Sequence, residues 1–209
     1  MARRKSEPQS VHRKKICEVA ERLFREKGIE KTTMSDIANE SGYSKATLYV
    51  YFKDKDELVG VLVLASMQKL YDYIRRAVNK EKSTREQFFD IFRSLMKYQK
   101  KYPLYFHMVL ENINIDFEST GYLPEEKETF MIGEKINALI GEYIKEGMEK
   151  GDIRNDLDIV PTIFSIWGMA SGTILLATNK EDYIRERMNK SKEEYVMYGA
   201  EMLFRSISA

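Results

Sequence analysis

Residues 44–58, Ser-Lys-Ala-Thr-Leu-Tyr-Val-Tyr-Phe-Lys-Asp-Lys-Asp-Glu-Leu, decide the fold of this 209-residue chain. Ser44 is a favoured N-cap residue and predicts a short helix that ends near Phe52. Leu48 and Phe52 lie four positions apart, so they share one face of that helix and are expected to be buried. The opposite face carries small or planar hydrogen-bonding side chains, namely Ser44, Lys45, Thr47, Tyr49 and Tyr51.

A second short helix precedes this one. Thr33 and Asp36 form a capping-box-like start, the helix runs to about Ser41, and Gly42 supplies a tight turn. Before it, residues 10–27 carry one apolar stripe that includes Ile16, Val19, Ala20, Leu23 and Phe24. Two short helices joined by a turn with glycine and docked on an apolar helix predict a helix-turn-helix, with the motif itself over 33–52.

The rest of the chain continues with helical periodicity, and strand-like alternation is absent, so we predict an all-α protein of about nine helices. A long helix begins at the Asp54 capping box, and residues 114–123 are the expected loop. The other helices are expected over 54–79, 84–100, 103–113, 124–150, 158–178 and 191–207. This pattern divides the chain into a helix-turn-helix domain, 10–54, and a second helical domain, 55–209.

The composition is that of a soluble globular protein, with 32% charged and 43% hydrophobic residues. A single cysteine, Cys17, excludes an internal disulfide and fits a reducing cytoplasm. The basic residues at the start are not followed by an apolar run, so a secretory signal is not expected. Residues 1–55 hold 13 of the 34 basic and 8 of the 33 acidic residues, a net charge of +5 on a chain of net +1. A basic end on a near-neutral body is typical of DNA binding, although chance clustering gives the same pattern.

The helix from Ser44 to Phe52 has the surface of a recognition helix. Bases are read by the N-terminal residues of such a helix, where Lys45 could donate to guanine and Ala46 could meet a thymine methyl group. Phosphate contacts, which fix register but not sequence, are expected from Thr33, Thr47, Tyr49, Tyr51 and Lys55. The basic residues at 3–5 and 13–15 are either an arm that reaches DNA or a solvated tail.

Residues 16–58 resemble the N-terminal domain of the TetR/AcrR (tetracycline-repressor) family of transcriptional regulators. The matching residues are Ile16, Ala20, Leu23, Phe24, Gly28, Thr32, Thr33, Met34, Ile37, Ala38, the run Ser41–Phe52, Lys55 and Leu58. The run that includes the recognition helix is the specific part. Two positions depart from the family pattern, because Ser41 replaces the usual alanine and Tyr43 replaces a small aliphatic residue.

The resemblance implies a homodimeric, cytoplasmic, all-α regulator, in most members a repressor of a palindromic operator. A small molecule bound by the C-terminal domain would release the DNA. The resemblance also implies DNA contacts from Thr33, Ser44, Lys45, Thr47, Tyr49 and Lys55. It places the dimer interface in the last two long helices, 158–178 and 191–207. The interface residues that we expect there are Ile166, Gly168, Met169, Gly172, Tyr195, Gly199, Met202 and Leu203.

Aromatic and methionine side chains are frequent in the middle helices and predict an apolar or aromatic effector. Any one aromatic at helical spacing is more often plain core. The expected ligand-binding residues are Phe88, Phe92, Met96, Phe106, His107, Phe130 and Trp167. His107 and Glu111 could share a metal ion, but a third ligand is not apparent, so we expect neither a metal site nor a cofactor.

Residues 159–179 contain no charged side chain and are long enough to cross a membrane. The small residues and Pro161 within this stretch favour a helix in a subunit interface. A membrane-anchored or purely structural helical protein stays as the alternative. An enzyme is not expected, because the sequence has no GxSxG, HExxH, CxxC or P-loop spacing.

Overall fold

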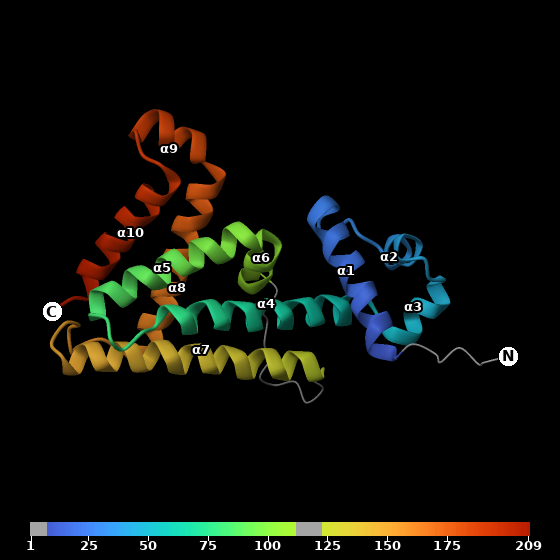
Figure 1. The fold of residues 1–209 in the computed structure, drawn as a ribbon, viewed down its shortest axis with the longest axis horizontal. Coiled ribbons are helices and arrows are strands. Elements are labelled where there is room, and N and C mark those ends of the chain that lie inside the picture. The colour runs from blue at the N-terminus through green and yellow to red at the C-terminus, as the bar shows by residue number, and fades with distance from the viewer. Residues whose placement is uncertain (1–7, 112–122) are drawn as a thin grey trace. The chain divides into compact units, whose positions relative to one another are not determined.

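The computed structural model of the protein describes residues 8–111 and 123–209, and these residues form ten α-helices (Figure 1). The predicted all-α class is therefore confirmed, and one isolated bridge between Ile153 and Ser208 is the strand-like pairing recorded in the described residues. The helices are α1 (Gln9–Lys27), α2 (Met34–Ser41), α3 (Lys45–Tyr51), α4 (Lys55–Ala77), α5 (Thr84–Lys101), α6 (Pro103–Glu111), α7 (Pro124–Glu149), α8 (Ile159–Asn179), α9 (Glu181–Met188) and α10 (Lys192–Ile207).

The helix α9 is the one described helix that the sequence did not predict. Its eight residues were overlooked because they bury one side chain, Ile184, so they show no apolar stripe. Local signals support this helix instead: Glu181 and Asp182 lie in its first turn and Arg185 in its last, where each sign complements the helix dipole.

Two predicted features lie partly or wholly outside the described residues. The helix expected over 103–113 is described as far as Glu111. The loop expected over 114–123 falls, apart from Leu123, in the stretch that the structure does not describe. Residues 3–5, the first half of the predicted basic arm, also lie outside it.

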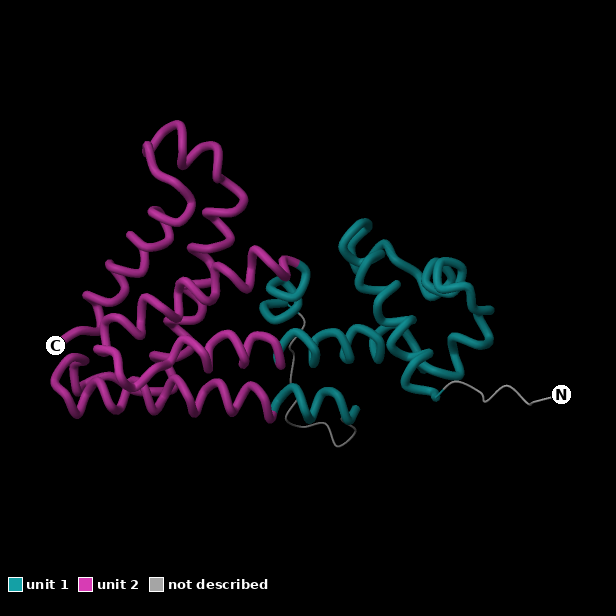
Figure 2. The backbone as a smooth tube through the Cα atoms, viewed as in Figure 1, with its two compact units in different colours: residues 1–67, 104–130 teal, residues 68–103, 131–209 magenta. Residues whose placement is uncertain are grey.

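The chain forms two compact units (Figure 2). The first consists of residues 1–67 and 104–130, so it contains α1 to α3, the start of α4, α6 and the start of α7. The second consists of residues 68–103 and 131–209. Two long helices, α4 and α7, thus belong to both units.

The second unit has a core in which α5, α8 and α10 pack together. Phe88 and Phe92 of α5 stack with ring centroids 5.1 Å apart, and Phe204 of α10 lies 5.3 Å from Phe88. Ile174 of α8 and Val196 of α10 are also fully buried. Aromatic pairs at these distances add to the stability gained from burying their surface.

Candidate nucleic-acid interface

The turn between α2 and α3 is fixed by short polar contacts. Thr33 and Asp36 form the predicted capping box at the start of α2. Gly42 takes the left-handed conformation, with φ of 75°, that a residue with a side chain adopts at a cost. Ser41, one of the departures from the family pattern, is buried, and its hydroxyl donates to the carbonyl oxygen of Ile37 at 2.6 Å. The serine therefore fits here because its polar atom is satisfied.

The second departure, Tyr43, ties the turn to α1. Its hydroxyl lies 2.7 Å from Nδ1 of His12, and the His12 ring packs on Tyr51 with centroids 5.3 Å apart. The ammonium group of Lys15 lies 5.1 Å from the centre of the Tyr43 ring. A small aliphatic side chain at position 43 could not make the contacts to His12 and Lys15, so the tyrosine adds a connection between α1 and the turn.

The helix α3 has the predicted two-sided character. Leu48 and Phe52 are 0% and 1% exposed, so the face toward α1 and α2 is fully buried. Ser44, Lys45, Ala46 and Tyr49 are exposed on the other side. Ser44 caps the helix by accepting from the backbone N–H of Thr47, and the two hydroxyls lie 2.7 Å apart. The hydroxyls of Ser44 and Thr47 therefore hold each other in place at the start of α3.

The exposed face of α3 also includes Val50, whose side chain is 71% exposed. This valine is not among the residues that the sequence predicts to contact DNA. An apolar group that projects from a recognition helix suits contact with a thymine methyl group. The spacing from Ala46 to Val50, four residues, could have shown that both lie on one face.

Two predicted phosphate-contact residues take part in internal contacts. Lys55 is half-buried, and its ammonium group donates to the carbonyl oxygen of Ile29 at 3.0 Å. Tyr51 is half-buried against His12, whereas Tyr49 is 46% exposed. Of these three, Tyr49 is the side chain that the structure presents outward.

Arg13 is a second correction, since it lies on α1 and not on a free arm. Its guanidinium donates to the carbonyl oxygen of Tyr51 and, at 3.1 Å, to Glu57. It also lies 4.2 Å from the centre of the Phe52 ring and 3.4 Å from a carboxylate oxygen of Glu125. One arginine thus joins α1 to the end of α3 and to the starts of α4 and α7.

The helices α8 and α10 present a row of exposed apolar residues, which we call the α8–α10 face. It consists of Phe164, Gly168, Met169, Gly172, Leu176, Tyr198 and Met202. Of the other predicted interface residues, Ile166 and Tyr195 are half-buried. Leu203 is 7% exposed and packs inside the subunit. A Cβ atom added to Gly199 would lie 3.0 Å from Thr173, so this glycine permits close approach of α10 to α8 within one subunit.

Within the described residues, α8 is also the one helix long and apolar enough to cross a membrane. Just 28% of its most apolar window is buried. Exposed apolar surface of this kind is typical of an interface with another subunit or with lipid.

The predicted sensing residues are divided between the two units. Phe88 and Phe92 are buried in the aromatic core, while Met96 and Trp167 are half-buried in the same unit. In the first unit Phe106 is buried, Phe130 is 36% exposed, and His107 is exposed with Nδ1 3.6 Å from Glu111. Among the residues described, no group of three His, Cys, Asp or Glu side chains is placed to hold a metal ion.

Two family models cover most of the chain. The model described as "Bacterial regulatory proteins, tetR family" matches residues 16–62, and "Tetracyclin repressor-like, C-terminal domain" matches residues 63–193. The chain belongs to the tetR family of bacterial regulatory proteins. The resemblance of residues 16–58 to this family is therefore confirmed, and the match extends to residue 193.

Individual members of the tetR family are similar to this chain to different extents. The HTH-type transcriptional regulator QacR of Staphylococcus aureus is 31% identical over 71% of this chain and 78% of its own length. TtgR of Pseudomonas putida is 38% identical over 81 residues. This aligned stretch is 39% of this chain and 38% of the length of TtgR. The structure of FadR from Bacillus subtilis, solved with stearoyl-CoA, has a TM-score of 0.68 at 16% identity and covers 93% of this chain and 98% of FadR.

Proposed function

We propose that this member of the tetR family is a cytoplasmic repressor that binds a palindromic DNA operator as a homodimer. The observation that carries this proposal is the surface of α3, where Leu48 is fully buried and Lys45, Ala46 and Tyr49 project outward. A helix so placed fits the major groove and reads bases from its first turn. The two α3 helices of a dimer would enter successive major grooves, roughly 34–36 Å apart.

The α8–α10 face supports the dimer. Phe164, Tyr198 and Met202 are each about 60% exposed, and a soluble monomer seldom exposes so many large apolar groups together. Gly168 and Gly172 lie in the same row and would let two α8 helices approach closely. Pairing this face with itself about a twofold axis buries the whole row in a closed interface.

In this proposal, a small apolar or aromatic effector binds the second domain and lowers the affinity of the dimer for DNA. Such a ligand lowers DNA affinity only if it binds the DNA-incompetent arrangement of the dimer more tightly. The stearoyl-CoA bound to FadR supports an apolar effector in this fold. Of the predicted residues, Met96 and Trp167 are better candidates for effector contacts than Phe88 and Phe92, because the two phenylalanines already pack in the aromatic core.

The alternative explanation of α8 is a membrane anchor. It predicts that the protein sediments with membranes and requires detergent for extraction. The dimer predicts recovery in the soluble fraction. Fractionation of the expressed full chain separates the two explanations directly.

The test of DNA reading is selection of bound sequences from random duplexes, followed by affinity measurements with Lys45→Ala. We expect two inverted half-sites, and we expect the variant to lose base preference at one position per half-site, at about 1–3 kcal/mol. Lys135→Ala, which removes an exposed lysine from α7, is the charge-matched control and should bind like the wild type. Equal sequence preference in Lys45→Ala and the wild type would show that α3 does not read the bases as proposed.

A further inference from the structure

A basic groove lies in the second unit, between the end of α4 and the middle of α5. It has a volume of about 450 Å³, within the roughly 300–1,000 Å³ that is usual for small-molecule sites. The side chains that line it are Tyr73, Arg76, Ala77, Lys82, Asp90, Arg93, Ser94 and Lys97. Four cationic groups face one carboxylate, so the groove has a net charge of +3.

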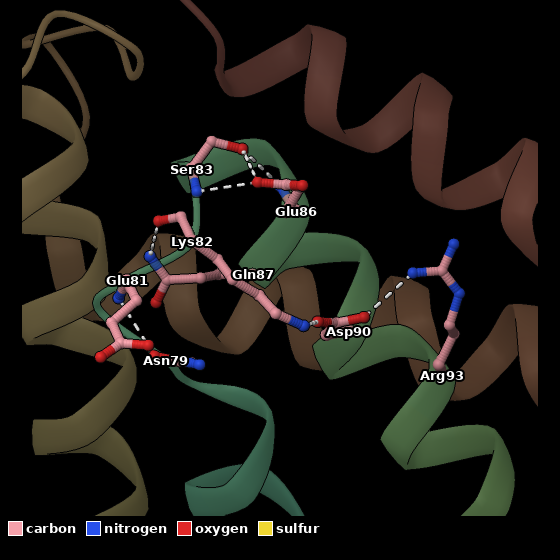
Figure 3. A network of polar contacts seen from close by, with 8 residues as sticks. All are labelled: Asn79, Glu81, Lys82, Ser83, Glu86, Gln87, Asp90 and Arg93. Atoms are coloured by element: carbon pink, nitrogen blue, oxygen red, sulfur yellow. Dashed lines mark hydrogen bonds and ion pairs between the residues drawn. The ribbon is translucent and has the colours of Figure 1, made fainter.

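Asp90 fixes two of the four cations. It lies between Lys82 and Arg93 and accepts from both, at 3.0 Å from the Arg93 guanidinium (Figure 3). These bonds, that from Lys82 above all, hold the pKa of Asp90 below its ordinary value despite partial burial. The carboxylate is thus ionised at neutral pH and holds both cations at the groove in place.

The remaining donors have no such partner. Among the residues that the structure describes, neither Arg76 nor Lys97 forms an ion pair, and the Ser94 hydroxyl makes no hydrogen bond. Four cations gathered around one carboxylate repel one another, and a bound anion relieves that repulsion. A guanidinium such as that of Arg76 presents two parallel N–H groups that match phosphate geometry.

The connection between the two helices makes the groove rigid. Ser83 and Glu86 form a capping box at the start of α5, and Gln87 donates to the carbonyl oxygen of Lys82 at 3.1 Å (Figure 3). On the α4 side, Tyr73 packs on Tyr98 with ring centroids 5.5 Å apart. A rigid site loses little conformational entropy when a ligand binds.

We infer that this groove binds a small phosphorylated molecule with at least two negative charges. The net charge of +3 calls for more than one anionic group, and the volume exceeds what a single phosphate fills. The site goes beyond the proposed function, because neither DNA reading by α3 nor an apolar effector uses it.

The test is isothermal titration calorimetry of the full chain with inorganic pyrophosphate, at low and at physiological ionic strength. We expect saturable binding that weakens at least tenfold in the double variant Arg76→Gln/Lys97→Gln. The matched control, Arg75→Gln/Lys100→Gln, removes the same charge from the same two helices outside the groove and should stay within twofold of the wild type. Lys97→Glu, which changes the charge of the groove by the same two units with one substitution, should also weaken binding and provides a second variant.

Three results would overturn the inference: no saturable binding to the wild type, equal weakening in both double variants, or full binding by Lys97→Glu. A loss of pyrophosphate binding in Lys45→Ala alone would place the anion on α3 and would also overturn it. Operator affinity measured without pyrophosphate should be unchanged in Arg76→Gln/Lys97→Gln. This separates failure of the anion site from failure of the proposed DNA reading.

Discussion

Replacing either glycine of the α8–α10 face by alanine should weaken the dimer without harming the subunit. A Cβ atom added at Gly168 or Gly172 would have no atom of the described chain within 4 Å. Inside the subunit the change therefore creates no clash. Because alanine favours a helix interior over glycine, it should stabilise the folded subunit by about 0.5–1 kcal/mol.

The partner subunit reverses that sign if the two α8 helices pack closely. Forcing extra methyl groups into a well-packed contact typically costs about 1–3 kcal/mol, and a twofold interface contains each substitution twice. Since about 1.4 kcal/mol corresponds to a tenfold change in affinity, the dimer dissociation constant should rise at least tenfold. Any loss of stability must then come from the interface.

Sedimentation equilibrium of the Gly168→Ala and Gly172→Ala variants measures this constant, and urea unfolding at low concentration measures the subunit. The control is Gly60→Ala on α4, where an added Cβ atom also has nothing within 4 Å. It should gain subunit stability and keep the wild-type dimer constant. If all three variants dimerise like the wild type, the α8–α10 face is not the interface.

Gly147→Ala should be destabilising, in contrast to Gly60→Ala, because its Cβ atom would lie 2.5 Å from the side chain of the buried Ile153. Urea unfolding should give it a free energy of unfolding about 1–3 kcal/mol below that of Gly60→Ala. Equal free energies would show that Ile153 moves aside without cost. Burial raises the pKa of the Cys17 thiol to about 11, so at pH 8 iodoacetamide should alkylate it about a hundredfold more slowly than in the unfolded chain; comparable rates would mean that the thiol is accessible and ionised. Hydrogen bonds from the hydroxyl and the backbone N–H of Ser83 hold the pKa of Glu86 below its ordinary 4.5. The stability that Glu86 contributes is therefore complete above pH 4.5 and is lost as the pH falls through the lowered pKa. Glu86→Gln should therefore be less stable than the wild type at pH 7 and equally stable at pH 2, and a constant difference would contradict this reasoning.

The sequence predicted what depends on short-range spacing. Leu48 and Phe52 are buried, and Thr33 begins α2 with a capping box, because these features are set by residues three or four positions apart. The helix α9 could not be predicted in this way, because its one buried residue, Ile184, gives no periodic pattern of apolar side chains.

Tertiary contacts could not be predicted in this way. The sequence predicts that Lys55 contacts phosphate, yet its ammonium group donates a hydrogen bond to the carbonyl oxygen of Ile29, 26 positions away. Phe88 and Phe92 have the composition of a ligand site, but Phe204 from the last helix packs against Phe88 in the core. The groove between α4 and α5 was also missed, since its cations come from three segments and form no run in the sequence.

Arg13 has a mechanical consequence for the helix-turn-helix. Its single side chain fastens the last residue of α3 to the first turn of α4, and the same group reaches Glu125 at the start of α7. Helix α3 cannot tilt against α1 unless these bonds stretch or break together. One guanidinium therefore helps to set the orientation of the exposed face of α3. A movement at the start of α4 or of α7 would act on that face through Arg13.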